Sequence, residues 1–197
     1  TNNKKKFYLK TFGCQMNRHD SERIETLLKE RGWEKADRDS DADIILLNTC
    51  SVRRHAEERV LGRLGKYRKW KEDKPSLLVG VIGCMAQIWE DRLWEEFPEL
   101  DLILGPGRFD RLPESIGELI RGGGRRIESG FDGESTFASA PLPEIRGVRA
   151  MVTVIRGCDR FCSYCVVPFA RGRELSRPAG EIATEVRRLT EAGVKEI

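Results

Sequence analysis

Short apolar runs alternate with amphipathic segments along the first part of the chain, and this alternation restricts the folds that it can adopt. The runs lie at residues 7–9, 44–47, 77–82 and 102–104. Apolar runs of this length with no polar face are typical of strands that are buried on both sides. Because helical segments separate the strands, the order predicts an α/β fold with a doubly wound parallel sheet and right-handed crossovers.

Between the runs, apolar residues recur at the spacing of one helix face and predict four helices. The residues that mark them are, helix by helix, Ile24, Leu27 and Leu28; Val60, Leu61, Leu64 and Tyr67; Leu93, Trp94 and Phe97; and Leu112, Ile116, Leu119 and Ile120. We expect the first helix to begin after an N-cap at Asp20 or Ser21, and Pro113 to lie in the first turn of the fourth.

The composition then changes, and residues 130–147 become rich in Gly, Ser, Ala and Pro, which is typical of a linker between domains. A second unit follows, with an expected strand at residues 148–155, a helix after Pro178 and the beginning of another strand at residues 194–197. A single βα unit buries too little surface to offset ordering costs of about 1.5 kcal/mol per residue. We therefore expect this second domain to be incomplete.

Charge and cysteine content narrow the class of protein. The chain has 35 Lys and Arg residues against 32 Asp and Glu residues, and a net charge of +3 is too small to indicate a nucleic-acid partner by itself. Residues 1–11 are basic but lack the apolar core of a signal peptide, so we expect a cytoplasmic protein without a membrane span. In that compartment, six cysteines indicate thiols, metal ligands or clusters rather than disulfides.

Three of the cysteines are far apart in sequence but have equivalent positions. Cys14, Cys50 and Cys84 each lie one to three residues past the carboxyl end of a predicted strand. In a parallel sheet those ends meet at one edge, where ligands bind, so the three thiols predict a shared metal or cluster site. Gly13 and Gly83 precede two of them and would allow a bulky inorganic group to approach the backbone. Taken singly, each cysteine is more often simply a small buried core or loop residue.

The other three cysteines form a compact motif. Cys158, Cys162 and Cys165 have the spacing C-x-x-x-C-x-x-C, which differs from the paired C-x-x-C of zinc ribbons and from the four-cysteine run of bacterial ferredoxins. Three thiolates on one loop can hold three corners of a cubane cluster and leave its fourth iron open. A three-cysteine zinc or structural site is the alternative.

Both halves together resemble the radical S-adenosylmethionine methylthiotransferases, and within that family the bacterial enzymes that act on tRNA. The resemblance is carried by TFGCQMN, DSE, ILLNTCSVR, GVIGCMAQ and RGCDRFCSYCVVPFARGRELSRP. It implies a methylthiotransferase N-terminal domain at residues 1–129, a linker at 130–147, and at 148–197 the first βα unit of a partial TIM-like radical domain. A fragment of this kind is expected to be inactive alone.

The resemblance also implies the cofactors and their ligands. Cys14, Cys50 and Cys84 are expected to hold an auxiliary 4Fe-4S cluster, and Cys158, Cys162 and Cys165 a second 4Fe-4S cluster that cleaves S-adenosyl-L-methionine to a radical. Tyr164 occupies the position where the family usually has an aromatic residue near the adenine of that cofactor. An electron donor such as flavodoxin or ferredoxin is an expected partner.

The substrate implied by the resemblance is tRNA bearing isopentenyladenosine, methylthiolated at carbon 2 of the adenine beside the anticodon. A related enzyme class modifies an aspartyl residue of a ribosomal protein, but its first motif is closer to GCPKN than to the GCQMN found here. Outside the family, the six cysteines are also compatible with a non-catalytic iron-sulfur electron carrier or a zinc-stabilised binding module.

Several polar and aromatic residues are weaker candidates for a functional role. Asn17, Asn48 and Arg53 flank the scattered cysteines and can orient a sulfur species or a base, although such residues are more often caps and turn formers. Arg171, Arg173 and Arg177 can meet tRNA phosphates or form a solvated face. We expect His19 and His55 to lie on the surface, and Trp89 and Trp94 to pack against the core.

Overall fold

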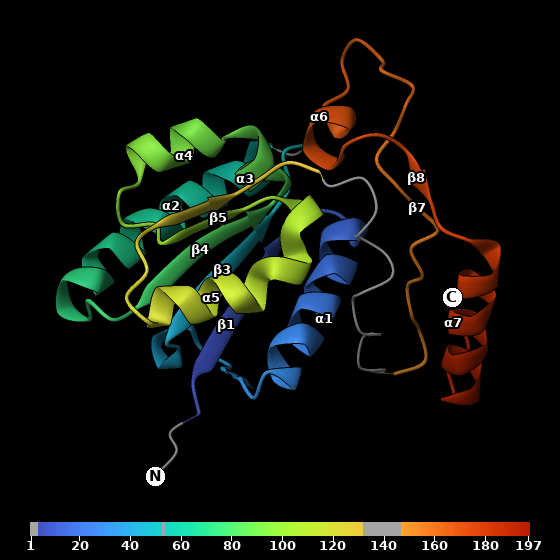
Figure 1. The fold of residues 1–197 in the computed structure, drawn as a ribbon, viewed down its shortest axis with the longest axis horizontal. Coiled ribbons are helices and arrows are strands. Elements are labelled where there is room, and N and C mark those ends of the chain that lie inside the picture. The colour runs from blue at the N-terminus through green and yellow to red at the C-terminus, as the bar shows by residue number, and fades with distance from the viewer. Residues whose placement is uncertain (1–3, 53, 132–146) are drawn as a thin grey trace.

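A six-stranded parallel sheet forms the centre of the computed structural model, which describes residues 4–52, 54–131 and 147–197 (Figure 1). The strands follow the order β2-β1-β3-β4-β5-β6. Their bounds are β1 (Lys6–Phe12), β2 (Glu34–Lys35), β3 (Ile44–Thr49), β4 (Leu78–Gly83), β5 (Leu102–Leu104) and β6 (Arg126–Glu128). The chain moves outward from β1 in both directions, so the strand order reverses between β1 and β3, where doubly wound folds bind their ligands.

Helices cover both faces of this sheet. They are α1 (Gln15–Glu30), α2 (Arg54–Asp73), α3 (Cys84–Ile88), α4 (Glu90–Glu96) and α5 (Leu112–Ile120), with 3-10 turns η1 (Asp39–Asp41) and η2 (Pro106–Arg111). In β3, Ile45 and Leu47 pack with α2, α3 and α4, while Ile44 and Leu46 pack with α1 and α5 on the other face. The predicted doubly wound α/β fold is confirmed, and the continuous apolar runs reflect burial on both faces.

In the described part of the first unit, the short strands β2 and β6 and the short helix α3 were not expected from the sequence. The edge strands β2 and β6 consist mainly of charged residues and therefore lack an apolar run. Helix α3 begins directly at the end of β4, where the apolar run gives no sign of a change from strand to helix.

Helix α1 begins earlier than predicted, at Gln15 rather than after Asp20 or Ser21. Its N-cap is Cys14, and the side chain of Asn17 in the first turn accepts a hydrogen bond from the Cys14 backbone amide. The first turns are buried against polar partners instead of the apolar core. For this reason they lack the apolar periodicity from which the helix start was predicted.

The second unit departs most from expectation. Its elements are β7 (Ile155–Arg156), α6 (Val167–Arg171), β8 (Leu175–Ser176) and α7 (Ala179–Glu191). The strand predicted at 148–155 is wrong except at Ile155, and β7 pairs antiparallel with β8. A strand needs a neighbouring strand to pair with its backbone amides. Residues 148–154 form only a parallel bridge, from Arg149 to Glu196. The strand expected at 194–197 is likewise reduced to this bridge.

The second helix of that unit is confirmed as α7, whereas α6 was not expected. Most of the proposed linker lies outside the described residues, and the domain boundaries at 129 and 148 stay a prediction. In the part of the chain that the structure describes, no helix is long and apolar enough to cross a bilayer.

Candidate functional site

The three scattered cysteines lie at the same edge of the sheet. Cys14 follows β1, Cys50 follows β3 and Cys84 follows β4, and these strands are neighbours. Pairing aligns their last residues, since Phe12 is opposite Thr49 and Thr49 is opposite Gly83. The backbone therefore brings the three positions into one row, at the side of the sheet where the strand order reverses between β1 and β3.

Glycines allow the three loops to approach one another closely. A Cβ atom on Gly13 would lie 2.7 Å from the Cβ of Cys50 and 2.4 Å from Oδ1 of Asn17. Gly83 has φ +92°, and a Cβ there would lie 2.8 Å from the carbonyl oxygen of Thr49. Any larger residue would thus push the loops apart, and at Gly83 it would also be strained.

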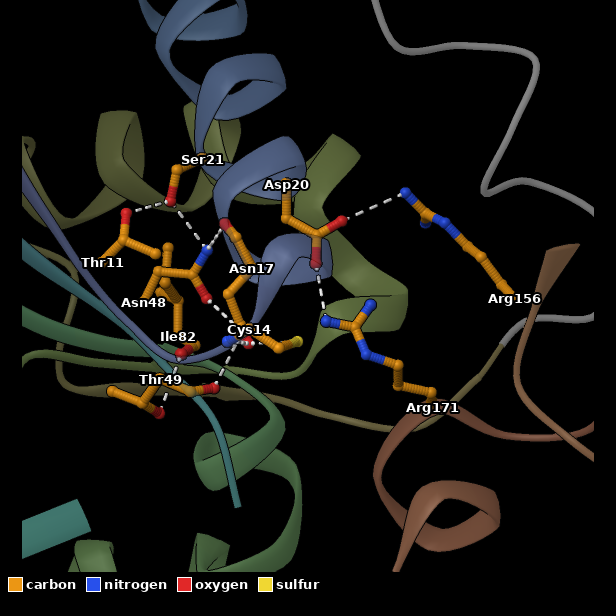
Figure 2. A network of polar contacts seen from close by, with 10 residues as sticks. All are labelled: Thr11, Cys14, Asn17, Asp20, Ser21, Asn48, Thr49, Ile82, Arg156 and Arg171. Carbon is orange, nitrogen blue, oxygen red and sulfur yellow. Dashed lines mark hydrogen bonds and ion pairs between the residues drawn. The ribbon is translucent and has the colours of Figure 1, made fainter. Parts of the chain in front are cut away.

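Two fully buried asparagines, Asn17 and Asn48, form hydrogen bonds between the loops (Figure 2). The amide nitrogen of Asn17 donates to Oδ1 of Asn48 at 3.2 Å and to the carbonyl of Thr49 at 3.1 Å. Asn48 in turn donates to the carbonyl of Asn17 and to the hydroxyl of Ser21, both at 2.9 Å. Oδ1 of Asn17 also accepts from the backbone amide and, at 3.2 Å, from the thiol of Cys14. This network couples the start of α1 to the end of β3.

A buried carboxylate connects the same region to the second unit. Asp20 in α1 forms one ion pair with Arg171 of α6, at 2.8 Å, and another with Arg156 of β7, at 3.4 Å. The carboxylate is fully buried, and about a tenth of each arginine side chain is exposed. Figure 2 shows both arginines reaching Asp20, and in the sequence β7 precedes and α6 follows the clustered cysteines. Sequence reasoning missed Asp20 and Arg156, since a single acidic residue within DSE gave no sign of a partner so distant in the chain.

The electrostatics of the scattered site follow from burial and from Arg171. Burial raises the pKa of the Cys84 thiol, while the charge of Arg171 and a hydrogen bond from it act in the opposite direction. Burial also lowers the pKa of Arg171, but Asp20 and the thiols of Cys84 and Cys14 outweigh it, so the pKa is raised and the guanidinium stays charged.

The clustered cysteines lie on the loop between β7 and α6. The amide of Cys158 donates to the carbonyl of Gly172 at 3.2 Å, and the amide of Cys165 donates to the carbonyl of Cys162 at 2.9 Å. Cys162 is exposed, and the side chain of Tyr164 is 89% exposed. The loop is therefore tight but open to solvent on the side where Tyr164 lies.

All six cysteines are free thiols. Among the described residues, no group of three or more His, Cys, Asp or Glu side chains is arranged to hold a metal ion. A 4Fe-4S cluster attaches each thiolate to a different iron, so its ligands stand farther apart than those around one ion. The scattered set offers the soft thiol donors that iron-sulfur clusters use.

Comparison with known proteins places the chain in a family. The model described as Uncharacterized protein family UPF0004 matches residues 6–105. The chain belongs to this family. The UPF0004 match runs from β1 to the end of β5 and includes all three scattered cysteines, while the clustered cysteines lie beyond it.

Curated relatives extend the similarity beyond the UPF0004 region. Proteins named tRNA-2-methylthio-N(6)-dimethylallyladenosine synthase are 40% identical in Haemophilus ducreyi, 42% in Actinobacillus pleuropneumoniae and 44% in Burkholderia ambifaria. Each alignment covers 98% of this chain but only 41–42% of the relative. The chain thus spans less than half the length of the relatives it matches, and the expected resemblance to bacterial tRNA methylthiotransferases is confirmed.

The remaining candidate residues divide into buried and exposed groups. His19 is not on the surface as predicted: it is buried beneath the second unit, and desolvation together with Arg23 lowers its pKa to about 4. His55 is exposed as expected. Arg53 lies outside the described residues. Trp89 and Trp94 pack against the core, as predicted.

The three arginines singled out after the clustered cysteines, Arg171, Arg173 and Arg177, do not form one solvated face. Arg171 and Arg177 are largely buried, and Arg177 pairs with Glu185 of α7. Arg173 is exposed and pairs with Asp159 at 2.7 Å. Only Arg173 of these three has the accessibility that a phosphate contact requires.

Proposed function

We propose that the full-length protein containing this chain methylthiolates carbon 2 of isopentenyladenosine beside the anticodon of tRNA. The observation that carries the proposal is the alignment of Cys14, Cys50 and Cys84 at the ends of three neighbouring parallel strands. The name of the relatives, at 40–44% identity over almost the whole chain, supports the substrate and the reaction. A three-thiol site and a separate C-x-x-x-C-x-x-C loop match a reaction that needs both a sulfur-handling site and a radical source.

In this proposal Cys14, Cys50 and Cys84 hold one 4Fe-4S cluster, and Cys158, Cys162 and Cys165 hold the other. When bound, the clusters and S-adenosyl-L-methionine supply the radical and the methylthio group needed at a carbon that has no acidic proton. Tyr164 is proposed to pack near the adenine of S-adenosyl-L-methionine. Its exposure in this chain leaves its ring available for such a contact.

The residues of the chain itself prepare the scattered site. Gly13 and Gly83 let the loops approach, and the Asn17–Asn48 pair fixes the end of β3 against the start of α1. Burial of Cys50 and Cys84 excludes water from two of the three thiols. Such a rigid arrangement lowers the ordering cost of binding a group that needs three ligands at set positions.

The open side of the clustered-cysteine loop indicates what the rest of the protein contributes. We propose that further strands of the radical domain cover this loop, that flavodoxin or ferredoxin supplies the electron, and that residues 1–197 alone are inactive. The boundaries at residues 129 and 148 belong to the same proposal.

The experiment that tests the function is an assay of the full-length protein, reconstituted anaerobically, on two substrates. We expect methylthiolation of tRNA bearing isopentenyladenosine and no modification of the ribosomal protein. Transcripts without the isopentenyl group are the matched control and should stay unmodified. Modification of the ribosomal protein alone would reassign the enzyme, and absence of both reactions with intact clusters would refute the proposal.

A further inference from the structure

Arg171 is the point at which the second unit reaches the scattered cysteines. It is the last residue of α6, the helix that follows the clustered cysteines, and α6 packs against α3, which begins at Cys84. The guanidinium nevertheless pairs with Asp20 of α1, 2.8 Å away. Arg171, which belongs to the second unit, therefore lies against the start of α1 in the first unit (Figure 2).

Several arginines gather around Asp20 at this interface. Asp20 receives both Arg156 and Arg171, one on each carboxylate oxygen. Burial and the neighbouring Arg156 lower the pKa of Arg23 to about 10. Buried charges are tolerated when opposite charges compensate them. The thiols beside Arg171 become such charges when they are deprotonated as ligands.

The guanidinium is close enough to the thiols to act on them. Arg171 donates a hydrogen bond to the thiol of Cys84, the first residue of α3. Asp20 accepts a hydrogen bond from the same guanidinium, and this contact fixes the position of the guanidinium relative to the cysteines.

We propose that Arg171 is a positioning residue of the scattered-cysteine site: held by Asp20, it places a fixed positive charge against the thiolates and raises the reduction potential of the cluster they bind. This inference rests on the proposed function, which assigns the cluster to those cysteines. Reduction adds negative charge, so a nearby cation favours the reduced state, and charge and hydrogen bonds to sulfur are established determinants of such potentials. Asp20 has the opposite sign and opposes this effect.

The test uses full-length protein in which the three clustered cysteines are changed to Ala, so that only the scattered set can load a cluster. Its reduction potential is measured by titration with electron paramagnetic resonance detection. We expect Arg171→Gln to lower the potential, Arg171→Lys to change it less, and the isosteric Asp20→Asn to raise it. Arg173→Gln is the matched control, because this arginine lies nearby in sequence but is exposed, and it should leave the potential unchanged.

The outcomes separate the inference from the proposed function. If the background protein loads no cluster although Cys14, Cys50 and Cys84 are intact, the proposed site itself is refuted. If the cluster loads and Arg171→Gln and Asp20→Asn leave its potential unchanged, or shift it in the same direction, Arg171 serves only packing. Should Arg171→Gln fail to fold, Arg171→Met, which also removes the charge, is measured in its place, and an unchanged or raised potential overturns the inference.

Discussion

At the scale of single residues, the candidate site is controlled by buried polar side chains. Asn17, Asn48 and Asp20 have almost no exposed surface, and each uses its polar atoms on a neighbour from another element. Buried polar groups stabilise a structure only while their partners remain, because an unsatisfied group retains the cost of leaving water.

Asn48→Ala tests this dependence. Removing the amide leaves the carbonyl of Asn17, the hydroxyl of Ser21 and the amide of Asn17 each without one of their bonds. We expect a loss of about 2–4 kcal/mol in the free energy of unfolding, measured by denaturant titration of the apoprotein. Thr26→Ala, which removes an exposed hydroxyl bond within α1, should cost far less, and equal losses would contradict the role given to Asn48.

His19 makes stability depend on pH. Its pKa is about 4 in the folded chain because burial and Arg23 disfavour the charged form, against about 6.5 when unfolded. The unfolded chain therefore binds the proton first, and stability present above about pH 6.5 is lost as the pH falls toward 4. The loss reaches about 3 kcal/mol.

The measurement is denaturant unfolding of the apoprotein across that window, with His19→Gln for comparison. The charged groups around His19 are Asp20, Glu22, Arg23, Arg156 and Glu185. The variant keeps these groups but has no titrating ring, so its stability should fall less between pH 6.5 and pH 4.5. Parallel curves for the two proteins would show that the acid sensitivity arises elsewhere.

At the scale of elements, the ends of β1, β3 and β4 determine the positions of the three cysteines more than the helices that follow them. Their register brings the three cysteine positions into line, and the glycines beside them set how closely the loops approach. Parallel pairing defines where the strands end, and in folds of this class ligands bind at this edge of the sheet.

Gly83→Ala tests the element scale. The positive φ and the carbonyl of Thr49, 2.8 Å from the new Cβ, should cost about 1–3 kcal/mol and move Cys84 away from Cys50. We expect a lower unfolding midpoint together with less iron retained after reconstitution of the full-length protein. Gly62→Ala in α2 is the control: nothing lies within 4 Å of its Cβ, so it should be neutral or stabilising and retain all its iron. A Gly83→Ala protein with full iron content would contradict the geometric argument.

At the scale of the whole molecule, the two cysteine sets belong to separate units joined through Asp20. If the clustered set generates the radical, Cys162→Ala in the full-length enzyme should abolish cleavage of S-adenosyl-L-methionine and all methylthiolation. Cys84→Ala should retain deoxyadenosine formation but lose methylthio transfer, because only the scattered site is damaged. Both products are quantified on soluble protein of known iron content.

The Cys162→Ala and Cys84→Ala variants also test the alternative that the scattered cysteines are merely buried hydrophobic residues. In that case Cys84→Ala lowers stability but leaves the yield of methylthiolated tRNA per folded molecule unchanged. The parent enzyme should bind about eight irons per chain, as two four-iron clusters require. Zinc at about one per chain, with no sulfide, would instead identify a structural metal protein.

Much of this molecule could be predicted from the sequence. The apolar runs at 44–47 and 102–104 determine buried parallel strands, because no other element buries such short segments on both faces. Strands of this kind in turn imply that Cys14, Cys50 and Cys84 share one edge. These inferences succeed because they depend on local pattern and on a general rule of connection.

The tertiary structure alone decided which polar residues are buried. His19 and Asp20 are polar residues typical of a solvated surface, and they are buried because the second unit covers α1 and contributes Arg171 to the contact. Likewise, residues 148–154 have the pattern of a strand but find too few neighbours to pair with. Apolar burial is determined by periodicity within an element, whereas the burial of a charge or the pairing of an edge depends on a partner far along the chain, which local sequence does not specify.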